Sequence, residues 1–301
     1  MLILGSSGAL PVNGRFTTSQ LLSVANHQFL IDCGEACQHQ LRKFEVSQHK
    51  INHIFVSHLH GDHYLGLTGL LFSMHLLHRE HDLHLYSFRG LEDILLAQFR
   101  HAHSVPHFKI VFHPLTEAKK EVIFEDEHVS VESFPMDHKI PTCGFIFREK
   151  PPPLSLDKSK DIGSIPVEYL VRLKRGEDIL NEKGEVTFRS ADYTLPPRPL
   201  RSYAYCSDTQ PSPQVVSAIK GIDLVYHEAT FMESEISKAR ETRHSTAAEA
   251  AAVARDAGAG RLIIGHFSAR YKELNLLLDE AVKIFPNTAL ALEGESFELT
   301  D

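Results

Sequence analysis

The side chains best suited to chemistry lie in one short segment, residues 57–63, which reads Ser-His-Leu-His-Gly-Asp-His. Four good metal ligands fall within six residues there: His58, His60, Asp62 and His63. The first two histidines are two residues apart, so an extended backbone points both to the same side. Gly61 permits a sharp turn, after which the last two ligands face the same pocket. Imidazole and carboxylate together suit zinc, and also manganese or iron.

A chain with 20 histidines could carry such a cluster on its surface by composition alone. The flanking elements favour a metal site instead. Residues 52–56 form a short apolar run typical of a strand, and the apolar residues of 63–78 recur at helical spacing. The four ligands therefore lie where a strand ends and a helix begins.

Strand and helix patterns alternate over the rest of the chain. Further strands are expected at residues 2–5, 19–25, 28–32, 83–86, 203–206, 224–226 and 262–264, and helices at 34–44, 91–101, 246–257 and 272–285. The early strands are linked by hairpins, whereas crossover helices come later. This order favours an α/β fold with two sheets sandwiched between helices over a doubly wound sheet.

Composition excludes several classes of protein. The chain has 301 residues, of which 43% are hydrophobic and 23% charged, as in ordinary globular proteins. No apolar run approaches the roughly 18 residues of a spanning helix, so we expect no membrane segment. The first five residues read as a buried strand and not as a secretory signal. The four scattered cysteines indicate reduced thiols and a cytoplasmic protein.

The charge is unevenly distributed along the chain. The formal net charge is −8, which does not by itself indicate nucleic-acid binding. Residues 149–201 differ, because they hold 7 of the 15 prolines and bracket a charged stretch with a turn signal around Gly184. We interpret this segment as an arm inserted into a single domain that spans residues 1–301. A decorated surface loop is the alternative.

The His-x-His-x-Asp-His motif in this setting resembles the metallo-β-lactamase superfamily. The resemblance implies an αβ/βα four-layer sandwich with two metals at one edge of the sheets. It also implies three further ligands, each of which has a match after a predicted strand: His138, Asp208 and His266. By the same resemblance, one metal is held by His58, His60 and His138, the other by Asp62, His63 and His266, and Asp208 bridges the two.

Several other segments narrow the resemblance to the RNase Z family, endonucleases that remove 3′ trailers from precursor tRNA. They are Leu-Gly-Ser-Ser-Gly-Ala-Leu-Pro at 4–11, His-Glu-Ala-Thr-Phe at 227–231, Arg-His-Ser-Thr at 243–246 and Gly-His-Phe-Ser-Ala-Arg-Tyr at 265–271. The likeness covers residues 2 to about 295. It implies two Zn²⁺ per subunit, with Mn²⁺ as the alternative, and a homodimer.

Glu228 and His244 are the most specific part of this resemblance, and they also make chemical sense. Cleavage of a phosphodiester expels a 3′-alkoxide, which leaves readily only when it is protonated. A histidine oriented by a carboxylate is a suitable general acid, so we assign the proton donor to His244 and its support to Glu228. Asp62 is expected to orient the attacking water. The alternative is that the pair only braces helices.

The arm fits the same family, whose members use such an arm to grip tRNA. Its basic residues are candidates for phosphate contacts: Lys158, Lys160, Arg172, Lys174 and Arg175. One loop departs from the family, because the usual Pro-x-Lys-x-Arg-Asn reads Pro-Val-Asn-Gly-Arg-Phe at residues 11–16. That change leaves recognition of the 3′ CCA end open.

The sequence therefore predicts a dinuclear-metal phosphodiesterase that trims precursor tRNA. One alternative is a phosphodiesterase or other hydrolase that acts on small molecules such as cyclic nucleotides, which the acidic charge and the altered loop favour. A second is a non-catalytic RNA-binding protein on the same fold, against which the intact ligand set argues.

Overall fold

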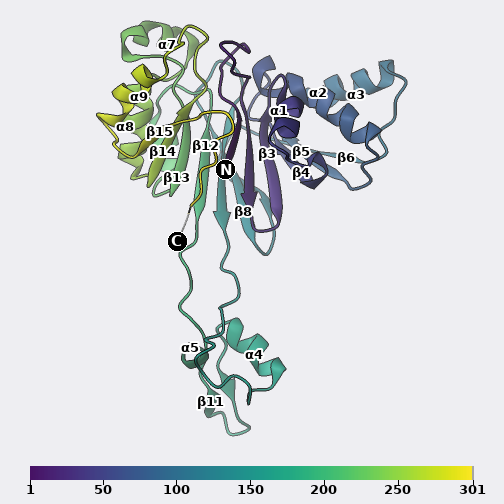
Figure 1. Ribbon diagram of the computed structural model, residues 1–301, viewed down its shortest axis with the longest axis vertical. Helices are drawn as coiled ribbons and strands as arrows, with labels where there is room; N and C mark the ends of the chain where they lie inside the picture. The colour runs from purple at the N-terminus through teal and green to yellow at the C-terminus, as the bar shows by residue number, and fades with distance from the viewer. Residues whose placement is uncertain (300–301) are drawn as a thin grey trace. The chain divides into compact units, whose positions relative to one another are not determined.

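The computed structural model describes residues 1–299 (Figure 1). The chain divides into two compact units, and each is described by itself. The first contains Met1–Arg148 and Ser202–Leu299, and the second contains Glu149–Arg201. No helix in the described part of the chain is both long and apolar enough to cross a membrane.

The first half of the larger unit forms a six-stranded sheet in the order β1-β2-β3-β4-β5-β6. Its strands are β1 (Leu2–Gly5), β2 (Ser19–Val24), β3 (His27–Cys33), β4 (Ile51–Phe55), β5 (Leu83–Ser87) and β6 (Ile110–Pro114). The first three strands pair antiparallel, and β3 to β6 are parallel. The connecting helices are α1 (Cys37–Lys43), α2 (Gly61–Leu76) and α3 (Leu91–His101), with a 3-10 turn η1 (Gln48–Lys50).

The second sheet of this unit has seven strands in the order β15-β14-β13-β12-β9-β8-β7. Its strands are β7 (Glu121–Glu125), β8 (Val129–Pro135), β9 (Cys143–Glu149), β12 (Ser202–Cys206), β13 (Leu224–Glu228), β14 (Arg261–Gly265) and β15 (Thr288–Leu290). Strands β12 to β15 are parallel. The accompanying helices are α6 (Pro213–Ala218), η2 (Glu233–Glu235), α7 (Ile236–Thr242), α8 (Ala247–Ala257) and α9 (Asn275–Val282).

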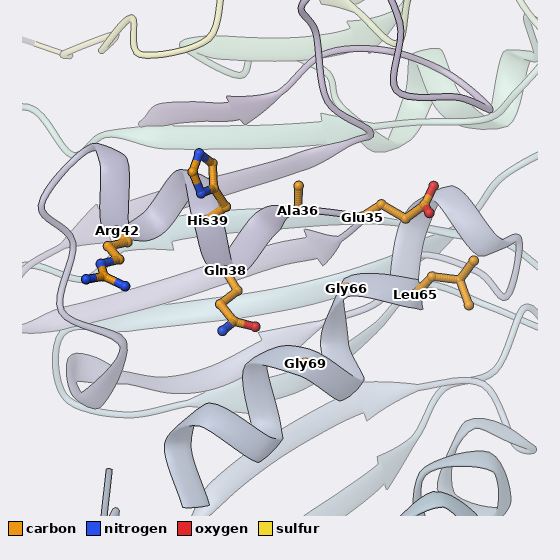
Figure 2. Close-up of a pocket in the computed structure, with 8 residues that line it drawn as sticks. All are labelled: Glu35, Ala36, Gln38, His39, Arg42, Leu65, Gly66 and Gly69. Atoms are coloured by element: carbon orange, nitrogen blue, oxygen red, sulfur yellow. The ribbon is translucent and has the colours of Figure 1, made fainter. Parts of the chain in front are cut away.

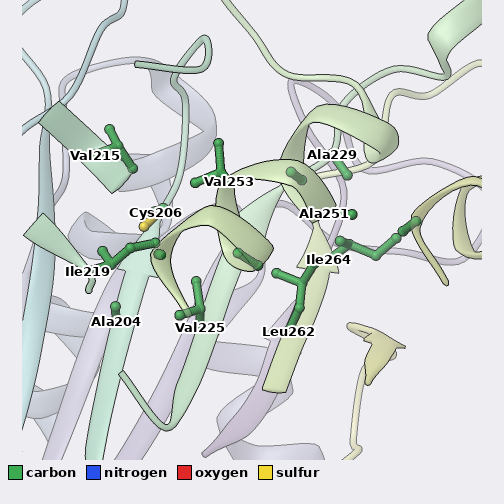
Figure 3. Packing of buried hydrophobic residues seen from close by; sticks show 14 of the residues in the cluster. Ala204, Cys206, Val215, Ile219, Val225, Ala229, Ala251, Val253, Leu262 and Ile264 are labelled. Atoms are coloured by element: carbon green, nitrogen blue, oxygen red, sulfur yellow. The ribbon is translucent and has the colours of Figure 1, made fainter. Parts of the chain in front are cut away.

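Three apolar clusters hold these layers together. Aromatic side chains fill the space between the sheets, with Phe29 and Phe55 from the first sheet against Phe145 and Phe147 from the second. A second cluster joins the first sheet to α1, α2 and α3. A third packs small residues of α8 against the other sheet (Figure 3). The order helix, sheet, sheet, helix confirms the predicted four-layer sandwich.

Helix α8 shows how local sequence fixes an element of this core. The side chain of Thr246 accepts from the backbone amide of Glu249, whose carboxylate accepts from the amide of Thr246, so a capping box starts the helix. Gly258 ends it at a φ of 65°, a conformation that glycine adopts at little cost. The small alanines between them let the helix approach β13 and β14 closely.

The smaller unit has its own secondary structure and its own small core. It comprises α4 (Val167–Lys174), β10 (Ile179–Leu180), β11 (Val186–Phe188) and α5 (Ser190–Tyr193). Strands β10 and β11 form a hairpin, as the turn signal at Gly184 predicts. Ile165, Leu173 and Ile179 are buried together. Helix α4 is not expected from the sequence, because its eight residues are too few to show a clear period.

Candidate metal centre

Five candidate ligands lie in loops that follow strands of the two sheets, and Asp62 and His63 lie in the first turn of α2. His58 lies just after β4, and His60 occupies the residue before α2. His138 follows β8, Asp208 follows β12 and His266 follows β14. Strands β12 and β14 are parallel neighbours of β13, so their carboxyl ends lie at the same edge of the sheet. The fold therefore brings His58 and His266 to one place, although 208 positions separate them in the sequence.

All seven predicted ligands gather into two neighbouring groups. The first group that could hold a metal ion contains His58, His60, His138 and Asp208. The second contains Asp62, His63 and His266. Asp208 joins the two, because its Oδ2 lies 3.3 Å from Nε2 of His58 and its Oδ1 lies 3.3 Å from Nε2 of His63. One carboxylate thus presents a separate oxygen to each group.

Distances between candidate ligand atoms test whether a metal ion fits. Four ligands at about 2.0–2.1 Å from a zinc ion lie about 3.3–3.4 Å from one another in a tetrahedron. Nε2 of His138 lies 3.2 Å from Nδ1 of His60 and 3.6 Å from Oδ2 of Asp208. Nε2 of His266 lies 3.4 Å from Oδ2 of Asp62 and 3.1 Å from Oδ1 of Asp208. The donor set fits a divalent metal ion.

Electrostatics at the centre also favours a cation. Burial alone would lower the pKa of His63, but the carboxylates of Asp208, Asp62 and Asp32 raise it well above its usual value. Nε2 of His63 is buried and makes no aligned hydrogen bond within residues 1–299. Burial, together with His63, lowers the pKa of His58 to about 4, so this imidazole is neutral at neutral pH and keeps a lone pair for a metal.

Most imidazoles of the centre are held from behind through Nδ1, which leaves Nε2 for a metal. Nδ1 of His58 lies 3.0 Å from Oγ of Ser57, and Nδ1 of His138 lies 3.0 Å from the carbonyl oxygen of Arg243. Nδ1 of His266 lies 2.9 Å from Oγ1 of Thr230. Such partners fix the ring orientation and the tautomer of a metal ligand. His60 is the exception, since it presents Nδ1 to the group.

Asp32 supports His63 in the same way. Its Oδ2 lies 2.7 Å from Nδ1 of His63 and accepts from the hydroxyls of Ser57 at 2.9 Å and Tyr205 at 2.5 Å. Sequence reasoning missed this role, and it also missed the role of Thr230. Asp32 left one signal, a carboxylate at the end of an apolar strand. For Thr230 the only signal was its membership of the motif at 227–231.

Three of these residues have backbone conformations that side chains other than glycine rarely adopt. The φ angles are 54° for Asp32, 57° for Asp208 and 57° for His266. Each such conformation costs of order 1–3 kcal/mol and persists only where the surroundings impose it. In this protein the left-handed conformation directs the side chains of these three residues, each at or just after the end of a strand, toward the metal centre.

The Glu228–His244 pair lies beside the metal-binding groups. Oε1 of Glu228 lies 2.7 Å from Nδ1 of His244. Burial opposes the charge on His244, but Glu228 and Asp208 raise its pKa to about 9, so the imidazole carries a proton at neutral pH. His244 also falls in a third possible ligand group, with Asp208 and His266. The geometry thus suits a proton donor, and metal content must separate this role from ligation.

The N-terminal loop closes one side of the centre. The amide of Ala9 donates to Oδ2 of Asp62 at 2.6 Å. A Cβ at Gly8 would lie 2.7 Å from the ring of His266, so only glycine fits there. The loop therefore fixes the carboxylate of Asp62, whose role in positioning water stays a prediction.

The five basic candidates of the arm belong to the other unit, and all are exposed. Nε of Arg172 forms an ion pair with Glu177 at 3.0 Å. The phosphate contacts assigned to these residues stay a prediction.

Comparisons with known proteins agree with the fold and the centre. Ribonuclease Z from Bacteroides fragilis is 45% identical over 293 residues, which are 97% of this chain and 96% of that protein. Ribonuclease Z from Porphyromonas gingivalis is 40% identical over 301 residues, with coverage of 99% and 98%. A family model described as anti-Pycsar protein Apyc1 matches residues 1–167, so the first half of the chain is also similar to that family.

The crystal structure of the short form of human tRNase Z superposes with a TM-score of 0.72 and 25% identity, and covers 100% of this chain and 99% of that one. The fold and the centre together define a metal-dependent hydrolase of the metallo-β-lactamase fold. The sequence relatives narrow this class to one family. This chain belongs to the ribonuclease Z family, as its motifs predict.

Proposed function

We propose that this protein cleaves precursor tRNA endonucleolytically and removes its 3′ trailer. The observation that carries the proposal is the contact between His244 and Glu228 beside two metal-binding groups in a chain of the ribonuclease Z family. The products would be a tRNA with a 3′-hydroxyl and a trailer with a 5′-phosphate.

The proposed cofactor is a pair of Zn²⁺ ions, with Mn²⁺ as the alternative. The two imidazole-rich groups and the shared carboxylate of Asp208 support two ions. When bound, such ions polarise a phosphoryl group and lower the pKa of a nearby water.

The side chains around the centre would divide the remaining tasks. Asp62, held by the amide of Ala9, orients the attacking water. His244 donates its Nε2 proton to the departing 3′-oxygen, since Nδ1 is engaged by Glu228. The buried carboxylate stabilises the positive charge that the imidazole carries before transfer.

The arm, residues 149–201, is proposed to bind tRNA away from the scissile bond. The exposed cations of α4 and its surroundings support this, because exposed lysines and arginines can meet backbone phosphates. Four buried thiols, Cys33, Cys37, Cys143 and Cys206, suit a reducing compartment and support a cytoplasmic location.

The proposed homodimer finds support in one face of the larger unit. α1 and the residues before it expose Glu35, Gln38, His39 and Arg42 along a hollow bordered by Leu65 of α2 (Figure 2). Glu35 and Arg42 lie at opposite ends of this stripe. If two copies pack their α1 helices antiparallel about a two-fold axis, each carboxylate meets the other copy's guanidinium. In that arrangement the face would be complementary to itself.

Charge reversal tests this face. Glu35→Arg and Arg42→Glu should each place like charges across the axis and shift the mass measured by light scattering toward the monomer. The double variant restores opposite charges and should return to the mass of the wild type. Equal masses for all four proteins would place the dimer contact elsewhere.

A precursor tRNA with a 3′ trailer tests the proposed function directly. Zinc-loaded protein is incubated with RNA that does or does not encode CCA, and the fragments are identified by mass. A cut next to the acceptor stem that leaves a 3′-hydroxyl supports the proposal and shows whether the altered loop at 11–16 still responds to CCA. Turnover of a small phosphodiester without cleavage of tRNA would favour the small-molecule alternative.

A further inference from the structure

Thr230 lies between the two halves of the catalytic centre. It follows β13, and only 6% of its surface is exposed. Its Oγ1 lies 2.6 Å from Oε2 of Glu228 and 2.9 Å from Nδ1 of His266. One hydroxyl thus contacts both the carboxylate that supports the proton donor and a candidate metal ligand.

The direction of these two hydrogen bonds follows from the number of protons available. Both oxygens of Glu228 accept hydrogen bonds from backbone amides, Oε1 from Thr209 at 3.0 Å and Oε2 from Thr230 at 3.1 Å, so this side chain acts as an acceptor. The single hydroxyl proton of Thr230 must therefore go to Glu228. The oxygen of Thr230 keeps its lone pairs for Nδ1 of His266, which must then donate.

A histidine that donates through Nδ1 and stays neutral has its lone pair on Nε2. Nε2 of His266 is the atom that faces Oδ2 of Asp62 at 3.4 Å and Oδ1 of Asp208 at 3.1 Å. The hydroxyl of Thr230 therefore selects the tautomer in which His266 can bind a metal ion.

We propose that Thr230 is a positioning residue that orients His266, through a hydrogen bond to Nδ1, as a ligand of one metal ion and not of the other. The proposal rests on the proposed metal centre. It predicts an asymmetric effect, because His266 belongs with Asp62 and His63, whereas His58, His60 and His138 form the other group.

The effect on His266 can be separated from an effect on the proton donor. Without the hydroxyl of Thr230, Glu228 still accepts from the amides of Thr209 at 3.0 Å and Thr230 at 3.1 Å, and it still contacts His244 at 2.7 Å. Removing the hydroxyl also removes its longer contact with Nδ1 of His244 at 3.4 Å, but Glu228 still holds that ring, whereas the ring of His266 loses its hydrogen-bond partner at Nδ1.

The experiment measures zinc binding by competition with a chromophoric chelator. The wild type should bind two zinc ions. Thr230→Val replaces the hydroxyl with a methyl group of similar size, and we expect about a 10- to 100-fold loss of affinity in one binding event only. Thr230→Ser keeps the hydroxyl and should restore both affinities. Thr288→Val is the matched control, since its hydroxyl donates to a backbone carbonyl, that of Phe285, in the same unit.

Nitrogen NMR of the His266 ring in the zinc-loaded protein provides a second readout. We expect a hydrogen-bonded Nδ1–H in the wild type and in Thr230→Ser, and loss of that hydrogen bond in Thr230→Val. Two wild-type affinities and an unchanged Nδ1–H signal in Thr230→Val would overturn the inference, and so would an equal loss at both metal ions. If the wild type itself binds no zinc, the proposed metal centre fails instead.

Discussion

Buried Glu228 and partly exposed His244 form a pair in which Oε1 of the carboxylate lies 2.7 Å from Nδ1 of the imidazole. Glu228 is the last residue of β13, and His244 follows α7. The pair therefore forms only because the chain, after α7, comes back to the end of β13. The amide of Thr209, next to the shared carboxylate Asp208, also donates to Glu228. The pair is therefore built into the metal centre.

The first prediction concerns His244. His244→Ala should lower cleavage of precursor tRNA by about 10²- to 10⁴-fold, the usual contribution of a general acid. A p-nitrophenyl phosphodiester should be affected much less, because p-nitrophenolate leaves without protonation. Steady-state kinetics on both substrates checks this difference.

Elemental analysis of the same variant separates the two possible roles of His244. Retained metal content would agree with a proton donor. Metal loss would make His244 a ligand, and equal rate losses on both substrates would also contradict the general acid. Glu228→Gln should show the same substrate dependence with a smaller loss, since the amide can still contact the imidazole.

The second prediction concerns the shared carboxylate. Asp208→Ala removes the oxygens that face both groups, so metal content should fall from two ions per chain to one or fewer. Asp256→Ala is the control, because this exposed carboxylate of the same unit belongs to neither ligand group and should leave two ions bound. Two ions in Asp208→Ala by elemental analysis would exclude a bridging ligand.

The sequence predicts the four-layer fold well, and it also predicts that the seven candidate ligands lie close together. The segment 57–63 has metal-ligand spacing that few other structures require, and each distant ligand follows a predicted strand. Hydrogen-bond partners such as Asp32 and Thr230 escape sequence reasoning, because any polar residue near a ligand could serve. Helix α4 escapes it too, since tertiary contacts of Leu173 hold that short helix.

The third prediction concerns Glu149, at the base of the arm. Partial burial opposes its charge, but hydrogen bonds from Arg201 and Arg198 lower its pKa to about 2. A carboxylate whose pKa is lowered on folding stabilises the fold above its unfolded pKa of about 4.5, and this stabilisation is lost as the pH falls toward 2.

Glu149→Gln should therefore destabilise residues 149–201 by about 1–2 kcal/mol at pH 7, after screening by solvent. Amide hydrogen exchange in the arm checks this, and the difference from the wild type should shrink as the pH falls from 4.5 to 2. Glu182→Gln, an exposed carboxylate of the same unit, should show no such difference. A constant difference across that range would mean that the charge of Glu149 does not stabilise the arm.

The last prediction concerns the arm as a tRNA-binding element. Its folded part begins at Leu154, whose amide donates to the carbonyl oxygen of Lys174. It ends at Leu195, whose amide donates to the carbonyl oxygen of Ser155. Deletion of residues 154–195 therefore removes this part and leaves Glu149 with Arg198 and Arg201.

This deletion should weaken tRNA binding at least tenfold while it preserves hydrolysis of a small phosphodiester, because all seven candidate ligands lie in the larger unit. Lys174→Ala with Arg175→Ala should reduce the dependence of log affinity on log salt by about one for each phosphate that these side chains neutralise in the wild type. Equal losses on tRNA and on the small substrate would show that the arm supports the fold of the centre and does not bind tRNA separately.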